Sequence, residues 1–373
     1  MLKEEVLELT DEKKHYIDIM RGISILRVML VHLGLSWFYP PYSQYIGIFL
    51  PVLFFVSGAV SYYSFKRARN SMEYLVKRVI LIIMPFYVFS IFVYFLTLTL
   101  YPEKLPAASD LISWLVVWPD FDTIFFPLNQ IWFINSLIFI VFLSAPLFAI
   151  SRSRTWVLWA VLIASICLSL ANTFYYPAYE TITTTEFLSD IRWGHQFWKS
   201  FMFLGIFIYG GLHYRYFSDL SESTYGLIAL LLLLLTAFFF FVFDFNFQLK
   251  DHVKTHSIYY ILLSFFGIYL FLALRKQVLF ILRKIPKAEA LILYTNRYAY
   301  SVFLLHTLVL FGVEKAFKLE NLSGELGLAL LRMLLVVVIT LILAKPLGDI
   351  SRIIAHKCRS TVLSFFRNEA APS

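Results

Sequence analysis

Charged residues are scarce in this sequence. Only 15% of its 373 residues are Asp, Glu, Lys or Arg, whereas 60% are hydrophobic. Soluble domains carry about 25% charged residues, which they need to cover a surface that faces water. This shortage excludes an ordinary soluble protein, and we expect the lipid bilayer to be the solvent for most of the chain.

Cysteines and recognisable short motifs are scarce as well. The two cysteines, Cys167 in an apolar run and Cys358 in a basic tail, are too few for a disulfide framework, and neither resembles a metal ligand. There is no internal repeat, no low-complexity tract and no Gly-rich phosphate loop. We therefore predict a single membrane domain over residues 1–373, with no metal and no cofactor of its own.

The net charge of +8 does not indicate a nucleic-acid partner, because the basic residues are scattered in short loops between apolar runs. Residues 1–15 are mostly charged and alternate in sign, unlike a signal peptide with its basic start and small-residue cleavage site. We expect this segment to be cytoplasmic and the first apolar run to stay as a membrane anchor.

Apolar runs of the right length recur along the chain. A spanning helix needs about 20 mainly apolar residues, and Pro, Gly and charge clusters mark the loops between them. The sequence predicts an all-α integral membrane protein, a bundle of about ten transmembrane helices. The predicted spans are 17–38, 45–65, 76–100, 131–150, 155–173, 198–214, 225–243, 257–274, 290–311 and 327–347.

Lys and Arg gather in alternate junctions, for example 66–78, 152–154 and 275–287, and in the predicted tail 348–373. The other junctions hold few basic residues, so the positive-inside rule places both termini in the cytoplasm. We expect a multi-pass protein of the plasma membrane, which in a bacterium is the inner membrane.

The two longest predicted loops, 101–130 and 172–197, fall on the outer side and combine acids with aromatic residues such as Trp114, Trp118 and Trp193. This aromatic content argues against disorder. Two roles remain open for these loops: docking of a carbohydrate on aromatic faces, or an interfacial helix with Trp at headgroup depth.

The first predicted span holds three ionisable residues, Arg21, Arg27 and His32. Such residues are costly in hydrocarbon and usually mark a functional path or a specific pairing. Arg21 and His32 are eleven residues apart, which places them within about 20° of one helix face and about 16 Å apart along the axis. We expect both to line one polar cavity, with the imidazole deep in the membrane as a proton-transfer group or else bonded to a backbone carbonyl. Arg27 is on another face and should form a buried pairing or reach the surface.

Other spans hold further polar residues. In the second span, Ser57 and Gly58 form a small-residue step that lets helices approach closely. His306 in the ninth span is a second deep imidazole, whose alternative role is a hydrogen bond between helices. Lys77 and Arg78, at the cytoplasmic entry of the third span, either hold a phosphate or anchor the helix at the membrane face.

Taken in order, these features resemble acyltransferase family three, the membrane O-acyltransferases of the polysaccharide-modifying type. The most specific signal is Arg21 followed by Gly, an apolar helix and then His32. The stretches Leu-Pro-Val-Leu-Phe-Phe-Val-Ser-Gly at 50–58, Ile-Trp-Phe at 131–133 and Tyr-Ser-Val-Phe-Leu-Leu-His at 300–306 are similar to further motifs of that family. The resemblance covers nearly the whole chain.

The resemblance implies transfer of an acyl group, most often acetyl from acetyl-CoA as co-substrate, to a hydroxyl of a cell-surface glycan or polysaccharide. His32 is then the expected general base, Arg21 holds the donor or shapes the field around it, and His306 has a structural or orienting role. The residues expected to contact donor or substrate are Arg78, Lys77, Arg69, Ser57, Trp132 and His306.

Two features depart from the family pattern. The family often has Arg-x-x-Arg before the third-span proline, whereas this chain has only Lys77 and Arg78. The family usually has an aliphatic residue where this chain has Arg27.

Two other functions share the same sequence features: a transporter or flippase for a glycan or lipid-linked sugar, and a scaffold without catalysis. The identity of the acyl group and acceptor, and the oligomeric state, stay open.

Overall fold

The computed structural model describes residues 10–34, 42–105, 107, 131–184, 192–245, 247–249, 252–253, 256–319 and 325–368. Every regular element in these ranges is a helix, which confirms the all-α class. The α-helices are α1 (Asp11–His32), α2 (Leu50–Arg67), α3 (Ser71–Leu100), α5 (Ile131–Ser151), α6 (Trp156–Thr184), α8 (Arg192–Tyr216), α9 (Glu222–Val242), α11 (Ile258–Ala273), α12 (Arg275–Lys284), α13 (Pro286–Arg297), α14 (Ala299–Phe317) and α15 (Leu326–Asn368). Two 3₁₀ helices, η2 (Tyr42–Phe49) and η3 (Pro102–Lys104), complete the set.

Within these ranges, seven helices are long and apolar enough to cross a membrane, and α11 with α12 makes an eighth if this pair, bent by 57°, is one span. The chain is thus a multi-pass membrane protein, but the predicted count of about ten spans is not confirmed. One reason is α1, which carries seven charged residues among 22 and so falls below the apolar content of a typical span. The other long helix outside this set is α8.

Several predicted boundaries were wrong. The first helix begins at Asp11 rather than at residue 17, and it ends at His32, so the imidazole lies at the helix end instead of deep within a span. The ninth predicted span, 290–311, is two helices, α13 and α14, which meet at Tyr298. The second span begins with η2 and becomes α-helical at Leu50, next to Pro51.

The last helix is longer than its predicted span, 327–347. α15 is continuous over 43 residues, passes through Pro346 and includes residues 348–368 of the predicted tail, whose cytoplasmic placement stays a prediction. At 1.5 Å per residue it is about 65 Å long, roughly twice the thickness of the hydrocarbon core. Ile350, Ile353 and Ile354 continue the helical spacing of apolar residues, which explains why the helix does not stop at Pro346.

The two predicted outer loops differ in outcome. Most of 101–130, including Trp114 and Trp118, lies outside the described residues. Much of 172–197 is helical, because α6 extends to Thr184 and α8 begins at Arg192. The side chain of Trp193 also lies outside the described part, so the carbohydrate-docking role of these loops stays a prediction.

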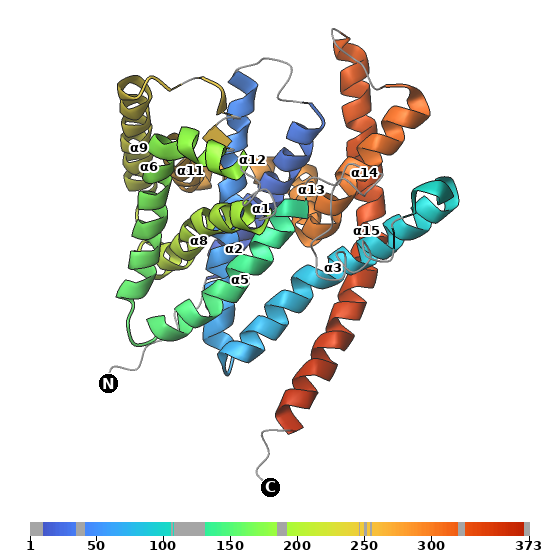
Figure 1. Cartoon of the computed structure of the whole chain (residues 1–373), viewed down its shortest axis with the longest axis horizontal. Helices are drawn as coiled ribbons and strands as arrows, with labels where there is room; N and C mark the ends of the chain where they lie inside the picture. The colour runs from blue at the N-terminus through green and yellow to red at the C-terminus, as the bar shows by residue number, and fades with distance from the viewer. Residues whose placement is uncertain are drawn as a thin grey trace.

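The helices form one bundle in which α1, α2, α5 and α13 lie between two outer groups (Figure 1). On one side α8 packs against α2 and α6, and α9 packs against α11; on the other, α15 packs against α3 and α14. The turns from α2 to α3 and from α5 to α6 lie at the lower end in Figure 1, and the C-terminal half of α15 extends past them.

The crossing of α2 and α8 is very close. A Cβ atom at Gly58 would lie 1.7 Å from the carbonyl oxygen of Phe207, and one at Gly210 would lie 1.9 Å from that of Phe55. Beside this contact, the rings of Phe54 and Phe203 stack with centroids 4.2 Å apart. The small-residue step predicted at Gly58 is therefore a helix contact, and it keeps the neighbouring Ser57 beside a cavity.

Candidate functional site

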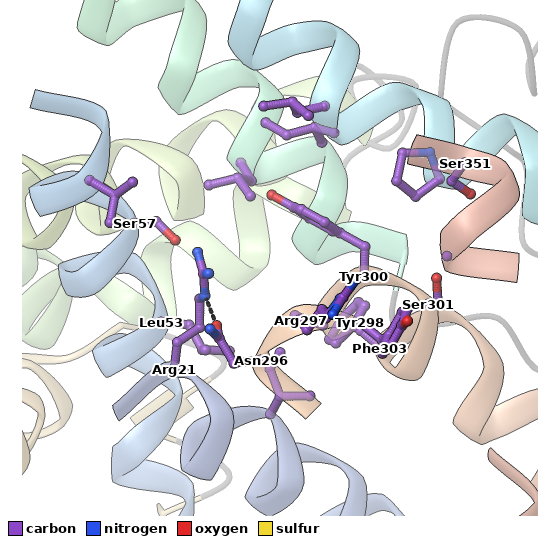
Figure 2. A pocket seen from close by; sticks show the side chains of 18 of the residues that line it. Arg21, Leu53, Ser57, Asn296, Arg297, Tyr298, Tyr300, Ser301, Phe303 and Ser351 are labelled. Carbon is purple, nitrogen blue, oxygen red and sulfur yellow. Dashed lines mark hydrogen bonds between the residues drawn. The ribbon is translucent and has the colours of Figure 1, made fainter. Parts of the chain in front are cut away.

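A cavity of about 250 Å³ lies where α1, α2, α3, α5, α13, α14 and α15 meet (Figure 2). The lining residues from α5 are all apolar, whereas each of the other helices contributes at least one polar side chain. The described residues that line it include four arginines and no acid. The polar lining residues are Arg21, Ser57, Ser61, Arg78, Asn296, Arg297, Tyr298, Tyr300, Ser301, Ser351 and Arg352.

Arg21 is held at the cavity by two polar partners. Its Nε donates to Oδ1 of Asn296, as Figure 2 shows, and its guanidinium lies 3.5 Å from Asp18. Asn296 in turn donates from Nδ2 to the same Asp18 carboxylate, at 2.9 Å. The close approach of α13 depends on Gly22, because a Cβ there would lie 2.3 Å from the carbonyl oxygen of Ile292. The Arg-Gly pair thus supplies both the cation and the room for its partner.

The basic residues at the start of α3 are separated by the structure. Arg78 lines the cavity and donates from Nη2 to the carbonyl oxygen of Val60 at 2.6 Å. Lys77 instead pairs with Glu73 at 2.7 Å, and the other oxygen of Glu73 accepts from the backbone N–H of Arg69. Neither Lys77 nor Arg69 lines the cavity, so of these three predicted donor-binding residues the geometry brings only Arg78 to it.

The sequence reasoning missed Arg297 and Arg352. Arg352 donates to the backbone carbonyl of Arg297, and its guanidinium lies over the Tyr298 ring, 4.6 Å from the centroid. Tyr298 donates to Asp349 at 3.1 Å, which ties the α13–α14 break to α15. The polar run Tyr-Thr-Asn-Arg-Tyr at 294–298 was a usable signal for this wall, whereas Arg352 was hidden in the predicted tail.

Two further predicted residues are placed as follows. Ser57 lines the cavity from α2, on the wall next to Arg21 (Figure 2). Trp132 does not line it; its ring stacks on Phe203 with centroids 6.1 Å apart, while the adjacent Phe133 forms part of the cavity wall. Trp132 therefore supports the wall from behind.

The two predicted histidines lie together at another place. His32 Nδ1 is 2.7 Å from His306 Nε2, and the rings stack with centroids 5.0 Å apart. His306 is fully buried, whereas His32, at the end of α1, is exposed. The pair therefore has one ring open to a substrate and one enclosed behind it.

The carbonyl of Val302 determines which ring nitrogen of each histidine carries the proton. His306 Nδ1 lies 3.3 Å from the carbonyl oxygen of Val302, which only accepts, so Nδ1 carries the proton. His306 Nε2 is then an acceptor, and His32 must donate to it from Nδ1. The remaining nitrogen, His32 Nε2, is left with its lone pair on the exposed ring, which is the state that a general base requires.

The cavity and the histidine pair are distinct sites joined by two helices. Arg21 lines the cavity and His32 does not; the two are eleven residues apart on α1, which corresponds to about 16 Å. The predicted single cavity lined by both is not confirmed. On α14, Tyr300 and Phe303 line the cavity and His306 follows one turn later, with its ring 5.9 Å from that of Phe303.

A comparison with known families identifies the family of the chain. The chain matches the sequence model of an acyltransferase domain over residues 14–346, nearly its whole length. It belongs to acyltransferase family 3. No curated protein and no solved structure matches it.

Family membership makes this chain a membrane acyltransferase, which requires an acyl donor and an acceptor as partners. The matched range begins before Arg21 and ends before Arg352, so it includes both histidines and three of the four cavity arginines. Among the described residues, no three His, Cys, Asp or Glu side chains come together as metal ligands.

Proposed function

We propose that this acyltransferase transfers an acyl group, in the first place acetyl from acetyl-CoA, to a hydroxyl of a cell-surface glycan or polysaccharide, with His32 as general base. The observation that carries the proposal is the hydrogen-bonded chain from the Val302 carbonyl through His306 to His32, which leaves a lone pair on Nε2 of His32, an exposed residue. A hydroxyl is a poor nucleophile at neutral pH, so its deprotonation is the main task of the enzyme.

During the acyl transfer, one proton moves from the acceptor hydroxyl to His32 and then to the leaving thiolate. His32 Nε2 takes the hydroxyl proton as the oxygen attacks the thioester carbonyl and forms the new C–O bond. The tetrahedral intermediate collapses with cleavage of the C–S bond, and the leaving thiolate takes the proton back from the imidazolium. One base serves both steps, while His306 holds its ring in place.

The arginine cavity is the proposed donor site. CoA carries several phosphate charges, and Arg21, Arg78 and Arg352 present guanidinium groups to one cavity without an acid in its described lining. The flexible arm of CoA separates its phosphates from the thioester, which suits two sites about 16 Å apart along α1. The acceptor would approach the exposed face of His32 from the other side.

Orientation follows from charge. The α2–α3 and α5–α6 turns carry Arg67, Arg69, Arg152 and Arg154, so we place this end, and both termini, in the cytoplasm of a plasma membrane. Cysteine labelling at Ser153, in a variant without Cys167 and Cys358, should occur only from the cytoplasmic side. Labelling from outside would reverse the topology.

The function is tested with purified protein in nanodiscs, labelled acetyl-CoA and the glycans of the host. His32→Ala and His32→Gln should lower transfer by about 10²- to 10⁴-fold, because a positioned base contributes that much. CoA binding should stay unchanged in both variants. Full transfer by either variant would exclude His32 as the base. Separately, mass spectrometry of surface glycans from cells with and without the protein identifies the mass of the acyl group.

Transport of a glycan or lipid-linked sugar remains the alternative from the sequence. Such proteins place their sites at paired broken helices of two repeated halves. The chain has no internal repeat, and nothing in the described residues or in the family match favours transport.

A further inference from the structure

Arg27 is a half-buried cation for which the described residues provide no partner. It lies on α1 five residues before His32, and within the described residues its guanidinium forms no hydrogen bond or ion pair; its Nε is fully enclosed. The arginines around it are different: Arg21 has Asn296, Arg78 has the Val60 carbonyl, and Arg332 has Glu314 at 2.7 Å.

Two described residues lie near Arg27: Gly47 and Tyr260. The guanidinium lies against η2, since a Cβ at Gly47 would be 3.5 Å from its Nη2. Tyr260 of α11 is close enough for electrostatic interaction with Arg27, and its hydroxyl is buried and unpartnered as well. His32 also lies within reach of the Arg27 charge. Arg27 thus lies near both the Tyr260 hydroxyl and the proposed base.

A lone charge in this position is expensive. Ionisable groups within a membrane protein are normally paired, because an unpaired charge removed from water destabilises the fold. An enclosed Arg27 Nε and an enclosed Tyr260 hydroxyl without acceptors among the described residues are therefore consistent with an acceptor that another molecule supplies. A full guanidinium charge calls for an acceptor with a formal negative charge, because a neutral oxygen leaves most of the electrostatic cost uncompensated.

We infer that Arg27, assisted by Tyr260, binds an anionic group of the acceptor glycan beside the hydroxyl that His32 deprotonates, so that this enzyme acylates acidic sugars. The inference deepens the proposed function and depends on it. Donor phosphates have their own arginines in the cavity, whereas Arg27 lies near the histidine end of α1. The anionic group is the carboxylate of a uronic-type sugar or a sugar phosphate, since both match the planar guanidinium fork.

The experiment compares matched acceptors. Oligosaccharides with glucose, glucuronate or glucose 6-phosphate at one position are offered with labelled acetyl-CoA to wild type, Arg27→Gln, Arg27→Lys and Tyr260→Phe in nanodiscs. Wild type should favour one anionic acceptor over the neutral one by about 10- to 100-fold in kcat/KM, the range of a charge-assisted hydrogen bond. Whether glucuronate or the phosphate gives this preference identifies the anion.

The variants should differ in how much of the preference for the anionic acceptor they keep. Arg27→Gln should bring the preference close to one, Arg27→Lys should keep part of it, and Tyr260→Phe should reduce it. The matched control is Arg154→Gln, which removes an exposed arginine in the α5–α6 turn and should keep the full preference. Equal losses on neutral and anionic acceptors in Arg27→Gln would overturn the inference, because they would mean that Arg27 acts on the transition state of every acceptor.

A second readout does not need activity. Without ligand, Arg27→Gln should have the same Tm as wild type or a higher one, because the substitution removes an unpaired charge. The preferred anionic oligosaccharide should raise the Tm of wild type and not that of Arg27→Gln. A lower Tm of the ligand-free variant would show a structural partner and overturn the inference. If wild type acylates no acceptor, the proposed function fails, and the thermal shift still tests the anion site.

Discussion

The arginine cavity and the histidine pair are built on the same two helices but by opposite means. In the cavity, side chains from α1, α2, α3, α13, α14 and α15 converge, and its cations are held by scattered partners such as Asn296 and the Val60 carbonyl. At the histidine pair, two imidazoles are hydrogen-bonded to each other, and a single backbone carbonyl sets both tautomers. The cavity thus suits binding of a polyanion, and the pair suits movement of a proton.

The distance between the arginine cavity and the histidine pair has a functional consequence. Because α1 and α14 each contribute to both places, these helices set the distance between donor phosphates and the base. A change at the histidine end should therefore affect turnover, and a change at the cavity should affect donor affinity. Substitutions at Arg332, His306 and Arg78 test this division in order of decreasing effect, and a fourth substitution at Lys13 probes a contact far from both places.

Arg332 of α15 is the contact whose loss should damage the histidine end most. It is buried and donates to Glu314 of α14 and, at 3.5 Å, to the carbonyl oxygen of Leu33, the residue after His32. Arg332→Met should lower the unfolding free energy by about 3 kcal/mol, because it breaks a largely buried ion pair. In the fraction that folds, turnover should fall while CoA affinity stays unchanged. Thermal unfolding and CoA titration measure the two effects, and an equal loss of CoA binding would contradict the division.

His306→Ala removes the group that orients His32. The freed imidazole can adopt either tautomer, so kcat should fall roughly 10²-fold while the KM for donor stays constant. The pH dependence of kcat should also change, since the proton acceptor of His32 Nδ1 is gone. His306→Asn, which can still accept a hydrogen bond, is the matched control and should recover part of the rate. Unchanged rates in both variants would contradict the orienting role.

Arg78 and Lys77 are adjacent in sequence and differ in structure, which makes them a matched pair. Arg78→Ala should raise the KM for acetyl-CoA by about 10- to 100-fold, the cost of losing a charge-assisted hydrogen bond. Lys77→Ala should change it little, because Lys77 pairs with Glu73 outside the cavity. Kinetics at two salt concentrations measure this, and equal effects of both substitutions would mean that general surface charge attracts the donor.

The smallest effect concerns the contact between α1 and the α8–α9 turn, far from both sites. Lys13 donates to Asp219 at 2.7 Å and thereby holds the pKa of that carboxyl below its ordinary value. A lowered pKa stabilises the fold above the unfolded value of about 3.9, and the benefit is lost as the pH falls through the folded value. Lys13→Gln should cost about 0.2–1 kcal/mol at pH 7, since the pair is exposed, and nothing near pH 2.

Thermal unfolding of both proteins at the two pH values tests this last prediction. Lys14→Gln, which affects only an exposed pair within α1, is the control. A difference that persists at pH 2 would show that Lys13 stabilises by packing and not by charge.

Much of the fold was predictable from sequence, and the errors share a cause. Apolar runs place a helix at each predicted span, because hydrocarbon requires each backbone polar group to bond within its own segment. The break at Tyr298 and the extension of α15 past residue 347 were missed because neither changes local composition strongly. In both cases neighbouring helices decide the outcome: Tyr298 donates to Asp349, and Arg352 lies over the Tyr298 ring.

By itself, the sequence determined the membrane environment, the helical class, the acyltransferase family and the choice of His32, Arg21 and His306 as residues to examine. These follow from composition, from 3.6-residue periodicity and from short motifs, all of which are local. Only the tertiary structure decided that His32 meets His306 and not Arg21, and that Arg78 faces a cavity while Lys77 does not. It also decided that Arg27 has no hydrogen-bond or ion-pair partner among the described residues. The reason is physical: which side chains meet depends on how helices far apart in the chain cross, and no local pattern records that crossing.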